Sequence, residues 1–261
     1  MEKETKKKHF VLVHGASLGA WSWYKVVALL KSVGHTVTAL DMAASGINPK
    51  TPEEVHSAMD YSEPLMEFME GLPEGERVIL VGHSFGGGSI ALAMEKFPKK
   101  IAVAVFVAAF MPCLGIDMDP IYIKYMRPKE FYMDYEYKFS EDHKQLIWMQ
   151  FGPNFMSTRM FQLCSPQDFE LALSLVRPQP GSVNPSDVEK HDLTEDNYGS
   201  VPRVFIQLEN DEMTNLPVDE FRLQNYPPQE VNTIPNADHM VMLSNPQHLS
   251  SCFHQISQKY H

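Results

Sequence analysis

Short apolar runs rich in β-branched residues alternate, over the first hundred residues, with segments whose apolar positions recur every three or four residues. Near-continuous apolar runs of this kind are typical of strands covered on both faces of a parallel sheet. They predict strands at residues 10–13, 36–40, 78–81 and 101–107. The helical periodicity predicts helices at 23–32, 62–70 and 89–96, the last stopped by Pro98. The alternation indicates an α/β fold with a mostly parallel, doubly wound sheet.

The alternation of predicted strands and helices stops after Pro112 and resumes near residue 200. Met, Tyr and charged residues crowd positions 121–160, where no strand longer than a few residues is convincing. Two further strands are predicted at 203–208 and 231–234, followed by an amphipathic helix over about 246–260. We therefore expect a single α/β domain over 1–261, with core segments 1–111 and 190–261 and an inserted cap at about 112–189.

Composition and charge narrow the possible partners. The chain has 261 residues, of which 44% are hydrophobic and 21% charged, as in folded globular proteins. Its 22 Lys and Arg stand against 33 Asp and Glu, and the net charge of −11 argues against nucleic acid and anionic membranes as partners. The longest nearly apolar stretch, 101–113, falls far short of the ~20 residues that span a bilayer. We expect no membrane association.

Three cysteines, Cys113, Cys164 and Cys252, lie at unrelated spacings. These spacings indicate neither a disulfide framework nor a metal site. The apolar run after the N-terminal lysines is too short for a signal peptide. A reducing, cytoplasmic location is expected.

The sharpest chemical signal is Gly82-His83-Ser84-Phe85-Gly86, a G-x-S-x-G sequence between a predicted strand and a predicted helix. This strand–turn–helix context is that of a nucleophile elbow, in which a sharp turn exposes the serine at the start of a helix. The helix N-terminus favours developing negative charge. Ser84 is the expected nucleophile, and the alternative is an ordinary Gly/Ser turn.

A serine is a weak nucleophile at neutral pH and needs a base and a group that orients the base. His239 follows the last predicted strand, and Asp211 follows the strand before it, which gives the order serine, acid, histidine. Glu209 and Glu212 are the competing acids. The histidines show no H-E-x-x-H spacing, so no metal is expected.

Acyl transfer also needs N–H donors for the tetrahedral oxyanion. A loop of small residues, beginning at His14-Gly15, follows the first predicted strand and leads into a helix. We assign the oxyanion hole to the main-chain N–H groups of Ala16 and Phe85. A phosphate-binding role for this loop is disfavoured because neither nucleotide-binding glycine motif is present.

Taken together, HFVLVHG (9–15), WSWYK (21–25), GHTVTALD (34–41), GHSFGG (82–87) and DHM (238–240) resemble the plant methylesterase family of α/β hydrolases. The similarity runs over nearly the whole chain and is weakest at about 113–150. The family includes methylesterases for salicylate and jasmonate, polyneuridine aldehyde esterase and hydroxynitrile lyases. The resemblance implies a cap, a buried pocket for a small-molecule ester, homodimers and no cofactor. It also supports the three catalytic assignments.

Within this family, two sequence positions distinguish the esterases from the hydroxynitrile lyases. The lyases carry a threonine beside the oxyanion loop and a lysine after the catalytic histidine, where this chain has Gly15 and Met240. A pocket without that cation favours an esterase over a hydroxynitrile lyase. A binding protein without turnover, as in plant hormone receptors of this fold, is the other alternative.

The expected substrate is the methyl ester of a small plant metabolite. Leu18, with residues 44–49 and 60–64, looks closer to the polyneuridine aldehyde esterase branch. We therefore expect a substrate with an alkaloid- or terpenoid-type skeleton. If this substrate has an aldehyde or ketone β to the carboxylate, the acid released could lose carbon dioxide. The cap is rich in aromatic residues, which commonly line pockets for flat ligands. We expect the pocket to be lined by Gly15, Leu18, Phe131, Tyr132 and Met240.

Overall fold

A parallel sheet of six strands forms the centre of the protein, in the order β2-β1-β3-β4-β8-β9. The computed structural model describes residues 7–183, 188 and 193–260. Every pairing in this sheet is parallel. The strands are β1 (His9–Val13), β2 (Thr36–Leu40), β3 (Val78–His83), β4 (Ile101–Val107), β8 (Arg203–Leu208) and β9 (Glu230–Ile234). This confirms the predicted fold class.

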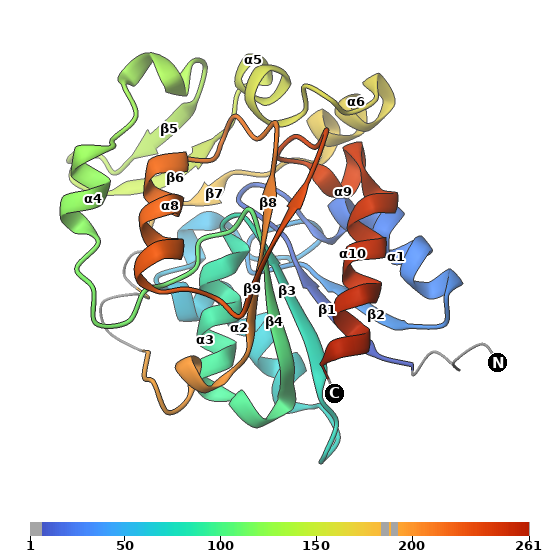
Figure 1. Ribbon diagram of the computed structural model, residues 1–261. Helices are drawn as coiled ribbons and strands as arrows, with labels where there is room; N and C mark the ends of the chain where they lie inside the picture. The colour runs from blue at the N-terminus through green and yellow to red at the C-terminus, as the bar shows by residue number, and fades with distance from the viewer. Residues whose placement is uncertain (1–6, 184–187, 189–192, 261) are drawn as a thin grey trace.

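Helices cover both faces of the sheet (Figure 1). The helices α1 (Tyr24–Ser32) and α10 (Pro246–Lys259) share one apolar cluster with Phe10 and Leu12 of β1. The helices α2 (Ala58–Glu70) and α3 (Gly86–Lys96) share the other cluster with Val11 and Val13 of the same strand. Successive residues of a strand point to opposite faces, so a strand buried on both sides must be apolar throughout.

The chain between β4 and β8 builds a second, smaller layer over one end of the core sheet (Figure 1). It contains an antiparallel sheet in the order β5-β6-β7. Its elements are α4 (Asp119–Lys124), β5 (Glu136–Phe139), β6 (Leu146–Gln150), α5 (Pro153–Phe155), α6 (Pro166–Leu175) and β7 (Gln179–Pro180). We propose that this layer is the inserted cap, whose expected end near residue 189 lies outside the described residues.

Shorter elements complete the chain. After β8 comes α8 (Leu216–Asn225), and after β9 comes α9 (Val241–Ser244). Single helical turns are η1 (Ala20–Trp23), η2 (Pro52–Glu54), η3 (Pro98–Lys100), η4 (Lys129–Tyr132), η5 (Met156–Met160) and η6 (Tyr198–Ser200).

The helix α2 starts four residues earlier than the predicted residue 62. The hydroxyl of Ser57 accepts a hydrogen bond from the N–H of Asp60 at 3.0 Å. A serine in this position caps a helix by satisfying one of its free N–H groups.

Candidate active site

Ser84 occupies a sharp turn between β3 and α3, with a backbone φ of +52°. A positive φ is unusual for a residue with a side chain and is retained where the surroundings hold it. Here the N–H of Ser84 donates to the carbonyl of Val107 at 3.1 Å, and the N–H of Phe110 donates to the carbonyl of Ser84 at 3.0 Å. A Cβ on Gly86 would lie 2.5 Å from the carbonyl oxygen of His14, so the turn needs glycine there.

His239 and Asp211 meet in the loops that follow β9 and β8. The Nδ1–H of His239 donates to Oδ2 of Asp211 at 2.8 Å, and both side chains are almost completely buried. The Asp211 carboxylate also accepts hydrogen bonds from the N–H groups of Met213 and Thr214 and from the Thr214 hydroxyl. These bonds fix the imidazole with Nδ1 protonated, so that Nε2 is the ring nitrogen available as a base.

The electrostatics of Asp211 favour its charged form. Burial alone would raise the pKa of this carboxyl, but the neighbouring His239 and the hydrogen bonds outweigh it and hold the pKa below its usual value. The competing acids lie elsewhere. Glu209 accepts a hydrogen bond from the N–H of Asn236, and Glu212 pairs with Arg159 at the surface.

The two residues whose N–H groups are assigned to the oxyanion hole border the same cavity as Ser84. Ala16 and Phe85 both line it. Within the described part of the chain, neither N–H donates a hydrogen bond to another group. Two free donors beside a serine at a helix N-terminus are suited to stabilising a developing oxyanion.

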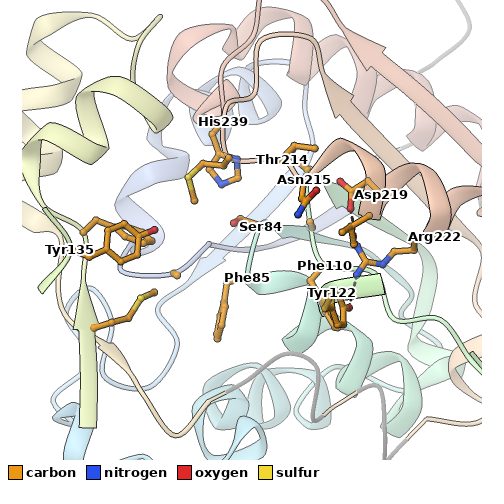
Figure 2. A pocket seen from close by; sticks show the side chains of 17 residues that line it. Ser84, Phe85, Phe110, Tyr122, Tyr135, Thr214, Asn215, Asp219, Arg222 and His239 are labelled. Atoms are coloured by element: carbon orange, nitrogen blue, oxygen red, sulfur yellow. Dashed lines mark hydrogen bonds and ion pairs between the residues drawn. The ribbon is translucent and has the colours of Figure 1, made fainter. Parts of the chain in front are cut away.

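The cavity between the sheet and the proposed cap has a volume of about 350 Å³. Ser84 and His239 both face it, and Figure 2 shows them near its centre. Five aromatic residues contribute to its wall, namely Phe85, Phe110, Tyr122, Tyr135 and Phe151. The volume lies in the range of sites for small organic ligands.

The residues expected to line the pocket do not border this cavity. Leu18 and Met240 are buried in the core cluster on the α1 and α10 face. Phe131 lies under the guanidinium groups of Arg127 and Arg159, and the Tyr132 ring packs against Phe131. Gly15 packs closely against the turn that holds Ser84. A Cβ at Gly15 would lie 3.0 Å from the Cβ of Ser84. The aromatic residues that line it from the proposed cap are Tyr122, Tyr135 and Phe151, whereas Phe85 and Phe110 come from the core.

Two buried side chains that the sequence analysis did not single out connect these loops. His83 donates its Nε2–H to the carbonyl of His239 at 2.8 Å, and burial together with the His239 ring holds its pKa well below the usual value. Asp238 accepts hydrogen bonds from the N–H of Leu163 and the hydroxyl of Ser244. Each adjoins a candidate catalytic residue in sequence, which is the signal that could have found them.

Comparisons with known proteins agree with this geometry. Residues 10–249 match the alpha/beta hydrolase family. The chain is 43% identical to polyneuridine aldehyde esterase from Rauvolfia serpentina, covering 97% of this chain and 96% of the relative. It is 44% identical to salicylic acid-binding protein 2 from Nicotiana tabacum, covering 97% and 98%. The crystal structure of polyneuridine aldehyde esterase superimposes with a TM-score of 0.88 at 42% identity, covering 97% of this chain and 100% of that chain.

Proposed function

The chain belongs to the α/β hydrolase family as a carboxylic ester hydrolase related to the plant methylesterases, and we propose that Ser84, His239 and Asp211 are its catalytic triad. The observation that carries the proposal is the 2.8 Å hydrogen bond from His239 to Asp211, made at the wall of the cavity that Ser84 also faces. Asp211 orients the imidazole and stabilises its positive charge when it takes a proton.

The proposed reaction has two halves. His239 Nε2 takes the proton of Ser84 Oγ as this oxygen attacks the ester carbonyl, and the N–H groups of Ala16 and Phe85 hold the oxyanion. His239 then gives the proton to the methoxy oxygen as its bond to the carbonyl carbon breaks. Methanol leaves, and the acyl group stays on Ser84 as an acyl-serine. A water, deprotonated by His239, attacks the acyl-serine, and the acid leaves as the proton returns to Ser84.

We propose the methyl ester of an alkaloid- or terpenoid-type metabolite as substrate. The similarity to polyneuridine aldehyde esterase and the aromatic wall of the cavity support this class. If the substrate holds an aldehyde or ketone β to the carboxylate, the acid released would lose carbon dioxide unaided. We also propose a homodimer in the cytoplasm: the family resemblance supports the dimer, and three free cysteines suit a reducing compartment.

The described residues hold no cluster of His, Cys, Asp and Glu suited to a metal ion. No helix in the same part of the chain has the length and apolar character needed to cross a membrane. Met240 brings no charge next to His239, so cyanide departure from a cyanohydrin would lack the cation that the lyases supply.

Turnover of p-nitrophenyl acetate, measured with and without EDTA, tests the proposed function. We expect hydrolysis that is insensitive to the chelator, because every proposed step uses side chains and main-chain groups. A protein that only binds its ligand, as the name of the tobacco relative describes for that relative, would show almost no turnover. Loss of activity on chelation that a divalent ion restores would contradict the mechanism.

The substrate proposal predicts an order of specificity. A polycyclic methyl ester should have a higher kcat/KM than methyl salicylate, since discrimination in an apolar pocket follows shape and is worth roughly 1–3 kcal/mol per methylene-sized misfit. A panel of methyl esters of salicylate, jasmonate, indoleacetate and indole alkaloids, read by product mass, measures the order. A preference for methyl salicylate would rule out selection for a larger skeleton.

A further inference from the structure

The cavity beside Ser84 has chemically different ends. Figure 2 shows Tyr135 on one side of Ser84 and Tyr122, Asp219 and Arg222 on the other. Tyr135 immediately precedes β5, Met149 lies in β6 and Phe151 follows β6. The rings of Tyr135 and Phe151 contact one another, which makes that end apolar and aromatic. The opposite end is polar, and most of its polar groups come from α8 and the loop before it.

An ion pair organises the polar end. Arg222 donates from Nη1 to Oδ1 of Asp219 at 2.8 Å and from Nη2 to the hydroxyl of Tyr122 at 2.8 Å. Its guanidinium also lies over the ring of Phe110, 5.0 Å from the ring centroid. With the Arg222 side chain only 4% exposed, the Asp219 carboxylate is held in one position against the cavity. A fixed, largely dehydrated carboxylate is suited to specific recognition.

Two hydrogen-bond acceptors at this end have no partner among the described residues. Asn215 donates its Nδ2–H to the carbonyl of Tyr125 at 2.7 Å, which leaves Oδ1 as an acceptor. Among the described residues, neither this oxygen nor Oδ2 of Asp219 accepts a hydrogen bond. Burial raises the pKa of Asp219 to about 6 in spite of Arg222, as expected for a carboxylate with too few donors. Poorly satisfied acceptors in a largely dehydrated wall favour a ligand that supplies donors.

We propose that Asp219 and Asn215 form a specificity subsite for a hydrogen-bond-donating group, an alcohol hydroxyl or an ammonium, on the acyl part of the substrate. The subsite rests on the proposed function, because it orients an ester whose carbonyl lies at Ser84. The donor belongs to the acyl part since the methoxy group is too small to carry it. A carboxylate would be repelled by Asp219, and an ether oxygen has no hydrogen to donate.

Matched substrates test the subsite. We would measure kcat/KM for straight-chain methyl esters of increasing length that end in a hydroxyl, a primary amine or a methoxy group. At one chain length, the hydroxyl or amine ester should exceed the methoxy ester by about 10- to 100-fold, the range for a hydrogen bond to a charged group. Equal kcat/KM values at every chain length would overturn the subsite. If the protein hydrolysed neither these esters nor p-nitrophenyl acetate, the proposed function itself would be overturned.

Substitutions test whether Asp219 is the residue responsible for the preference for hydrogen-bond-donating esters. Asp219→Asn should reduce the donor preference to within a few-fold, most strongly for the amine ester because the negative charge is lost. Glu220→Gln, an exposed neighbour on α8, should keep the preference. If Asp219→Asn fails to fold because Arg222 loses its partner, Asp219→Leu/Arg222→Met replaces the pair with apolar groups. The preference is the ratio of two kcat/KM values measured on one protein preparation. A change in the amount of active protein affects both values equally and leaves the ratio unchanged. Survival of the preference in a folded Asp219 variant would overturn the assignment.

Discussion

Ser84→Ala is expected to fold like the parent protein and to lose roughly 10³-fold or more of its ester hydrolysis rate. The hydroxyl oxygen is the atom that forms the acyl bond in the proposed reaction, and no other side chain can replace it. Alanine keeps the Cβ, so the turn at φ +52° and its main-chain hydrogen bonds should remain. Steady-state turnover of p-nitrophenyl acetate, with circular dichroism to verify folding, measures the effect.

A matched control for this variant is Ser89→Ala, which removes a buried hydroxyl from α3, the helix that follows the Ser84 turn. Ser89 accepts a hydrogen bond from the hydroxyl of Ser62 and does not border the cavity. We expect its turnover to stay close to that of the parent. If Ser84→Ala retained activity within tenfold of the parent, Ser84 would not be the nucleophile.

Asp211→Asn is expected to cost roughly 10³- to 10⁴-fold in kcat, somewhat less than His239→Ala. The amide can keep Oδ1 as acceptor for the N–H groups of Met213 and Thr214, so the loop should hold its shape. The amide nitrogen cannot accept from Nδ1 of His239. The imidazole then favours the tautomer whose Nε2 carries the proton, and this nitrogen cannot take one from Ser84.

The competing carboxylates provide matched controls for the acid. Glu209→Gln and Glu212→Gln change side chains that bond to Asn236 and Arg159, away from His239. Each should leave kcat nearly unchanged. Either of them proving more harmful than Asp211→Asn would show that the acid has been misassigned.

The central strands of the core sheet were predictable from sequence because they are buried on both faces. All seven residues of β4 are buried, and its observed bounds equal the predicted 101–107. In the segment that follows, burial does not impose a pattern. The four residues of β5 are all exposed, and the five of β6 are all half-buried, so neither strand alternates. The expectation of no strand beyond a few residues was therefore wrong for β6.

Burial also determines which parts of the site could be predicted from the sequence. Ser84, Asp211 and His239 each follow a predicted core strand, so their order along the chain indicated their proximity. The helix α8 was missed because Val218 and Arg222 are its buried residues, too few for an apolar stripe. Without that helix, the polar end of the cavity at Asp219 could not be foreseen. Aromatic composition predicted the character of the wall, but only folding decides which rings face it.

The most direct test of the account is to identify the residue that carries the acyl group during turnover. The protein would be mixed rapidly with p-nitrophenyl acetate, quenched in acid, digested, and its peptides examined by mass spectrometry. We predict one acetyl group on Ser84, formed as fast as the initial release of p-nitrophenol and absent from Ser84→Ala. Turnover with no acylated peptide, or with the acetyl group on another residue, would contradict the proposed mechanism.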